Sequence, residues 1–157
     1  MEPTVTITGI DEVLLRLKGL QSFEMQRKGM TLGMRKAGEF LKKLMQHKAP
    51  VLTGALADSI TVATRGTTAA EAVVRVGPSS KIEWRARFTE YGTKAHEIKT
   101  AFVLANVSTG EFFGSAVNHP GARAHPFIRP AYDEGAEQAR EIAAAAILAF
   151  IEKQAEG

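Results

Sequence analysis

The chain contains no cysteine among its 157 residues, and this absence narrows the chemistry that it can perform. Disulfide bonds, thiol nucleophiles and cysteine-ligated zinc sites are all excluded, so stability cannot depend on oxidation. No apolar run approaches the roughly 20 residues that span a bilayer, and residues 1–4 lack the basic and apolar regions of a signal peptide. We therefore expect a soluble protein that folds in a cytoplasm and does not enter a membrane.

The sequence motifs of common enzymes are missing as well. There is no glycine-rich dinucleotide or P-loop motif, and no serine lies in the G-x-S-x-G context of a hydrolase. The net charge of +3 permits contact with nucleic acid but does not require it, because no run of lysine and arginine is dense enough for a phosphate-binding arm. The sequence therefore predicts no cofactor, no metal ion and no catalytic residue.

One group of residues keeps an enzyme open as an alternative. A metal-dependent or acid–base site would have to use Glu90, His96, His119 and His125, which lie in one long stretch of the chain. These residues do not show the spacing of a helical H-x-x-x-H site, and histidines beside prolines in turns commonly bond to the backbone. A nonspecific nucleic-acid-binding module is a further alternative, which predicts affinity that falls steeply with salt.

Apolar residues make up 45% of the chain, which is enough for a buried core in a single domain over residues 1–157. Apolar residues recur every three or four positions after Asp11, over residues 24–48 and over residues 130–153, which predicts three helices. In residues 24–48 the predicted buried face includes small residues, which permit close approach of another backbone. This face comprises Met30, Gly33, Ala37, Phe40, Leu41, Leu44 and Met45. β-Branched alternation predicts a short strand over residues 4–8.

Shorter elements fill the middle of the chain. Thr53 is expected to cap a short helix over residues 54–59. Residues 60–64 and 71–77 alternate as an antiparallel hairpin with a turn between them. Trp84, Phe88 and Tyr91 have helical spacing, which predicts a short helix. Residues 94–118 read as a second, longer hairpin that projects from the domain, and its tip comprises Val107, Ser108, Thr109, Gly110 and Glu111.

Together these elements predict an α+β fold. We expect an antiparallel sheet with the long N-terminal and C-terminal helices packed on one face, plus the extended hairpin as an insertion.

Several blocks of the sequence carry a resemblance to a known family. They begin at Ile7–Leu14 and Leu17–Leu20 and continue through the remaining blocks in order: Ala49–Ile60, Val74–Pro78, Phe88–Thr93, His119–Gly121 and Pro126–Ala131. In this order and spacing the chain resembles the small minor tail or neck proteins of long-tailed bacteriophages, typified by the gene-ten-like tail component of a lambdoid coliphage. The hairpin over residues 94–118 departs from relatives with a shorter connection.

The resemblance implies an assembly role without catalysis. Such proteins are expected in the virion, at the joint between head and tail, as a ring, typically of six copies, that completes the tail end after synthesis in the host cytoplasm. The implied partners are head-closure or connector proteins, tail terminator or tail tube proteins, and DNA that passes through the ring without sequence-specific binding. The residues carried over as structural or interface positions are Thr53, Gly54, Glu90, Gly92, Thr93, His119, Pro120, Gly121, Pro126, Phe127, Arg129 and Pro130.

Glu90 and Arg129 are single charges within otherwise apolar blocks. One reading is an ion pair within the chain that pins the loop to the last helix, and the other is a pair between subunits. The sequence favours the pair within the chain and leaves the other open.

Overall fold

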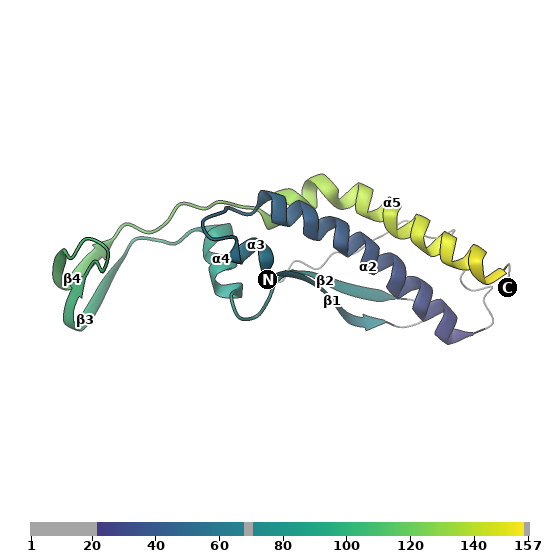
Figure 1. Cartoon of the computed structure of the whole chain (residues 1–157), viewed down its shortest axis with the longest axis horizontal. Helices are drawn as coiled ribbons and strands as arrows, with labels where there is room; N and C mark the ends of the chain where they lie inside the picture. The colour runs from purple at the N-terminus through teal and green to yellow at the C-terminus, as the bar shows by residue number, and fades with distance from the viewer. Residues whose placement is uncertain (1–21, 68–70, 156–157) are drawn as a thin grey trace.

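The computed structural model describes residues 22–67 and 71–155 (Figure 1). The elements follow in the order α2 (Phe23–Lys48), α3 (Ala55–Asp58), β1 (Ile60–Thr67), β2 (Ala72–Pro78), α4 (Glu83–Tyr91), β3 (His96–Ala105), β4 (Phe112–His119) and α5 (Ile128–Ala155). The predicted α+β class is confirmed. The described residues form two separate two-stranded antiparallel sheets, β1–β2 and the long hairpin β3–β4. The strand predicted over residues 4–8 and the helix after Asp11 lie outside the described residues.

Helix α2 is the central layer of the body, between the β1–β2 sheet and α5 (Figure 1). The predicted buried face is confirmed, since Met30, Ala37, Leu41 and Met45 are all buried. Both long helices lie on the same side of the sheet, but only α2 packs on it extensively, whereas α5 packs on α2. The body therefore has three layers.

Glycines set the spacing on both faces of α2. A Cβ atom on Gly33 would lie 2.5 Å from Cγ1 of Ile147 and 2.8 Å from the backbone oxygen of Ala143, both in α5. A Cβ atom on Gly38 would lie 2.8 Å from Cγ1 of Val62 in β1. Each glycine costs about 1 kcal/mol of helix propensity, but overpacking would cost about 1–3 kcal/mol. Close contact therefore explains why small residues stand at these positions.

Helix α5 presents small side chains to α2. Ala139, Ala143 and Ile147 are fully buried, and a Cβ atom on Gly135 would lie 2.5 Å from Cδ1 of Leu44. The predicted helix over residues 130–153 is confirmed and extends to Ile128 and Ala155. The alanine run Ala143–Ala146 therefore contributes to the contact between the two helices, because Ala143 is buried against α2.

The first hairpin, β1–β2, supplies the lower layer of the core. Ile60 pairs with Pro78, and Val62 pairs with Val76. The pairing shifts at a bulge between Thr64 and Gly66. The hairpin was predicted correctly, but β1 runs on to Thr67 where a turn was expected from residue 65, because the bulge lets the pairing continue.

The short helix α3 was predicted over residues 54–59 and is observed over Ala55–Asp58. Gly54, at φ +75°, occupies the N-cap position expected for Thr53. The Thr53 hydroxyl oxygen instead accepts a bond from the N–H of Ala55 at 3.4 Å. The side chain of Gln46 in α2 donates to the carbonyl of Ala57 at 3.1 Å, which holds α3 against α2.

The second hairpin, β3–β4, extends away from the three-layer body (Figure 1). Its two strands pair without interruption from the His96–His119 pair to the Lys99–Ala116 pair. The pairing then shifts, so that Leu104 lies opposite Gly114. The extra residues of β3 therefore bulge out of the ladder. No helix in the described part of the chain is long and apolar enough to cross a membrane.

Candidate functional site

The side chain of Glu90 joins α4 to the beginning of α5. One carboxylate oxygen, Oε2, accepts the backbone N–H groups of Phe127 at 2.8 Å and Ile128 at 2.9 Å. The other oxygen, Oε1, accepts the N–H of Arg129 at 3.1 Å. The first N–H groups of a helix have no partner within the helix and carry partial positive charge. Glu90, only 4% exposed, therefore caps a helix that begins far away in the sequence.

The contact between Glu90 and Arg129 differs from the predicted ion pair. It lies within the chain, but it joins the carboxylate to the backbone N–H of Arg129, and no ion pair links the carboxylate to the guanidinium group. The side chain of Arg129 is exposed. Pro130, the third residue of the helix, has no N–H and so leaves no donor unpaired in this first turn.

Just beyond α4, the two segments that connect the β3–β4 hairpin to the body, residues 92–95 and 120–127, pair in a short antiparallel bridge. We call these segments the hairpin legs and their contact the leg crossing. The N–H of Thr93 donates to the carbonyl of Ala122 at 2.9 Å, and the N–H of Ala122 donates back at 3.2 Å. Gly92 has φ +70° and Gly121 has φ +84°, conformations that favour glycine. A Cβ atom on Gly92 would lie 2.5 Å from the carbonyl oxygen of Ala122, and one on Gly121 would collide with the carbonyl of Thr93. Both glycines are therefore required by backbone-to-backbone contact.

The second leg, residues 120–127, is hydrogen-bonded to the body before α5 begins. The N–H of His125 donates to the carbonyl of Thr89 in α4 at 2.7 Å. Phe127 is completely buried in the core, whereas Pro120 and Pro126 are exposed. The hairpin legs, α4 and α5 thus meet at one joint, formed by Glu90, the leg crossing and Phe127.

The histidines considered for metal binding do not form a metal centre in the described residues. The rings of His96 and His119 lie 5.1 Å apart, centroid to centroid. Nδ1 of His96 bonds to the carbonyl of Lys94 at 2.9 Å, and Nδ1 of His119 accepts the N–H of Gly121 at 3.0 Å. No three His, Cys, Asp or Glu side chains in the described ranges gather as metal ligands. Both histidines instead support the hairpin backbone.

Helix α4 turns its aromatic residues outward, which sequence reasoning missed. Trp84 is 53% exposed, Phe88 is 49% exposed and Tyr91 is 62% exposed. The rings of Trp84 and Phe88 meet edge to face with centroids 5.9 Å apart, and the guanidinium of Arg85 lies 5.1 Å from the Trp84 ring centroid. Tryptophan, tyrosine and arginine dominate the binding energy of protein interfaces. We call Trp84, Phe88 and Tyr91 the aromatic face.

The tip of the long hairpin is exposed and internally ordered. The side chain of Asn106 accepts the N–H groups of Ser108 at 2.9 Å and Thr109 at 3.3 Å. The N–H of Gly110 donates to the carbonyl of Asn106 at 2.7 Å, with φ +70° at the glycine. Val107 is fully exposed, and the large side chains Phe102, Phe112 and Phe113 are also exposed. The tip is thus an ordered turn, with exposed apolar side chains at Val107 and on the adjoining parts of the two strands.

A cavity of about 350 Å³ opens beside the joint. Its floor includes Val76 and Ala86, which are buried, and Tyr91 of the aromatic face also lines it. Its charged lining residues include Arg87 and Arg129, both with exposed side chains. We call this the joint pocket.

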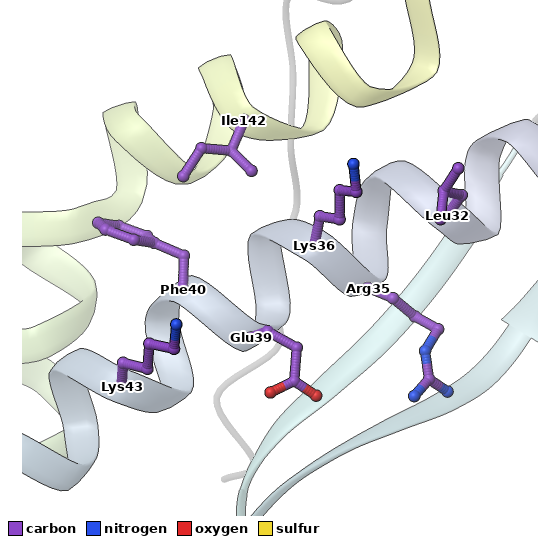
Figure 2. A pocket seen from close by; sticks show the side chains of 7 residues that line it. All are labelled: Leu32, Arg35, Lys36, Glu39, Phe40, Lys43 and Ile142. Atoms are coloured by element: carbon purple, nitrogen blue, oxygen red, sulfur yellow. The ribbon is translucent and has the colours of Figure 1, made fainter. Parts of the chain in front are cut away.

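A second, shallower hollow of about 460 Å³ lies between α2 and α5. Figure 2 shows Phe40 of α2 and Ile142 of α5 facing one another across it, with Lys36 and Lys43 beside Phe40. It is an open trough with basic side chains at its edge.

The remaining predicted site residues, Thr53 and Gly54, serve α3 locally. Next to them Leu52 is almost fully exposed. The predicted site residues that come before and after the long hairpin therefore lie together at the joint. Thr53 and Gly54 lie elsewhere, in the turn that begins α3.

One comparison with known proteins gives a match. The family model described as "Bacteriophage HK97-gp10, putative tail-component" matches residues 16–92. The predicted resemblance is confirmed over this part, which includes α2, β1, β2 and α4 and ends at Gly92 of the leg crossing. No curated protein and no solved structure gives a match.

Proposed function

Residues 16–92 are similar to the HK97-gp10-like bacteriophage tail components, which indicates a structural role in a phage tail, and from this premise we propose a place at the head–tail joint. The protein forms a closed ring around the DNA channel, with six copies as the family resemblance implies. It joins head-closure or connector proteins on one side to tail terminator or tail tube proteins on the other. It works without catalysis.

The observation that carries this proposal is the projecting hairpin, with exposed apolar side chains at and beside its tip. A two-stranded hairpin alone is only marginally stable, so burial of its exposed apolar side chains against a partner would stabilise it. Val107, Phe102 and Phe112 are each more than three-quarters exposed. Such a surface supports a role in which the hairpin is covered by another subunit or another virion protein.

A closed ring needs two different surfaces on each subunit, because each contact is head to tail. The chain has two candidates in the hairpin tip and the aromatic face of α4. They differ in shape, since the tip is a narrow turn and the aromatic face is one side of a helix. A head-to-tail contact between two such surfaces continues from copy to copy, as a ring requires.

The charge of the chain supports passage of DNA without sequence reading. The exposed cations Arg35, Lys36 and Lys43 line the trough on α2. The one aromatic ring in its lining, Phe40, is half-buried and faces Ile142 of α5, so it is not a free platform for stacking on bases. We expect weak DNA affinity that falls with salt concentration. An enzyme is less well supported, because both oxygens of Glu90 are used by the N-terminus of α5.

Electron microscopy of assembled particles tests the proposal. Antibody or gold labelling of the chain should mark the junction between head and tail, and averaged images should show a ring there. A label along the tail tube, at the distal tail end or on the capsid would contradict the joint. A chain that is monomeric both in solution and in particles would contradict the ring.

A further inference from the structure

Two of the positively charged side chains that line the joint pocket have no ion-pair partner in the described part of the chain. Glu83 at its rim pairs with Arg75 at 2.9 Å, and Glu90 is bonded to the start of α5. By contrast, the exposed guanidinium groups of Arg87 and Arg129 make no ion pair with any described residue. The pocket therefore suits an apolar segment that bears a carboxylate.

The hairpin tip has this chemistry. Glu111 is the one charged residue between Lys99 and His119, and its exposed carboxylate makes no ion pair within the described ranges. Val107 and Phe112 flank it as exposed apolar side chains. The Asn106 turn holds these groups in one conformation, so docking loses less conformational entropy than docking of a flexible loop.

The tip cannot reach the pocket of its own chain. The pocket includes Tyr91 and Ile128, which lie at the root of the hairpin. The eight residues of β4, at about 3.4 Å each, carry the tip roughly 25 Å away from that root. The pairing of Thr93 with Ala122 holds the legs in an outward course (Figure 1). A tip that fills this pocket must therefore come from a second copy.

We propose that the hairpin tip of one copy docks in the joint pocket of the next copy. The Glu111 carboxylate lies between the guanidinium groups of Arg87 and Arg129, and the apolar residues around it contact Tyr91 and the aromatic face. The contact is head to tail, and its repetition closes a ring where the rotation between neighbouring copies returns to the first copy. This inference rests on the proposed ring and adds the surface that receives the hairpin.

Site-directed cross-linking in assembled particles tests the contact. Because the chain has no cysteine, a bismaleimide reacts with this chain only at introduced positions. Thr109→Cys with Gly77→Cys leaves Glu111, Arg87 and Arg129 in place, because Gly77 lines the joint pocket and a Cβ atom there meets nothing within 4 Å. This pair should give a ladder of cross-linked subunits. Each single variant should give monomer. Thr109→Cys with Arg65→Cys is the matched control, since Arg65 is exposed on β1, and it should also give monomer.

Charge reversal gives a second measurement. Glu111→Arg and Arg129→Glu should each lower incorporation into particles about tenfold, and the double variant should return to within about threefold of the original. Arg129→Glu places an acid in the first turn of α5, which favours the helix, but close to the Glu90 carboxylate that accepts the backbone N–H of this residue, so the stability of this variant is measured separately. A circular dichroism melt of each purified variant provides this measurement.

The outcomes separate the inference from the proposed function. A ladder from the first cysteine pair supports both. Particles that contain the chain at the joint but give no ladder and no charge rescue overturn the docking and leave the ring standing. Absence of the unaltered chain from the head–tail joint overturns the function and the inference together. Cross-linking of Cys at position 109 to a different virion protein assigns the tip to that partner and contradicts the docking.

Discussion

The carboxylate of Glu90 and the backbone N–H of Phe127 form a 2.8 Å hydrogen bond between residues 37 positions apart. Glu90 is the buried charged residue of the described core, and Phe127 is completely buried beside it. The same carboxylate also bonds to the next two N–H groups. The start of α5 is therefore set by a side chain of α4, on the opposite side of the hairpin insertion.

Removal of this cap should destabilise the protein. Glu90→Ala leaves three N–H groups at the start of α5 without their acceptor, and we expect a loss of about 2–4 kcal/mol in the free energy of unfolding. Glu90→Gln keeps one acceptor oxygen and should lose less. Urea denaturation followed by circular dichroism measures both. Glu137→Ala is the control, because the Glu137 side chain is 70% exposed in a surface pair with Arg140, and its effect should stay within about 0.5 kcal/mol.

Gly121 should tolerate no side chain. At φ +84°, with the carbonyl of Thr93 against its Cα, Gly121→Ala should cost about 1–3 kcal/mol. The damage should centre on the leg crossing, so hydrogen exchange at the Thr93 and Ala122 amides should accelerate more than exchange in α2. Gly66→Ala is the comparison, since a Cβ atom there meets nothing within 4 Å. Equal effects of the two substitutions would contradict the close crossing.

Deletion of the hairpin should separate folding from assembly. Replacing Phe102–Phe113 with a short turn removes exposed residues, whereas the joint and the three-layer core remain. We expect a melting temperature within a few degrees of the original protein and particles that are not completed. Phe102→Ser with Phe112→Ser keeps the hairpin length and tests its apolar surface alone. Normal infectivity from the deletion would refute a role for the hairpin in assembly.

Removal of metal should leave the protein unchanged. The oxygens of Glu90 are bonded to backbone N–H groups, and the Nδ1 atoms of His96 and His119 are bonded to the backbone. We therefore expect dialysis against EDTA to leave the thermal unfolding curve in place, and elemental analysis to find less than about a tenth of an equivalent of transition metal. A stoichiometric metal ion whose loss lowers the melting temperature would revive the enzyme hypothesis.

The long helices could be predicted because their buried residues recur with a strong helical period. Met30, Ala37, Leu41 and Met45 mark the inner face of α2 directly. The two hairpins followed from alternating β-branched residues and glycine-containing turns. Local spacing does not reveal the layer order, however, because the apolar faces of α2 and α5 fit either a sheet or another helix.

The joint was harder to predict, since its contacts join distant positions. The spacing of Trp84, Phe88 and Tyr91 identifies a helix but does not say which face is buried, and here Ala86 and Glu90 face inward. A capping residue is normally sought immediately before its helix, whereas Glu90 precedes α5 by 38 positions. The sequence shows that Glu90 is a single acidic residue in an apolar block. This indicates that the residue is important, but it does not identify the N–H groups to which it bonds.

The leg crossing also has a mechanical consequence. One leg continues from α4 and the other continues into α5, and Glu90 bonds the two helices where the legs leave the body. A pull on the hairpin tip is therefore carried along both strands to α4 and α5. The Glu90 carboxylate and the backbone bonds of Thr93 with Ala122 and of His125 with Thr89 share this load. Both ends of the hairpin are fixed to the body, so a load applied at its tip reaches the buried residues Glu90 and Phe127.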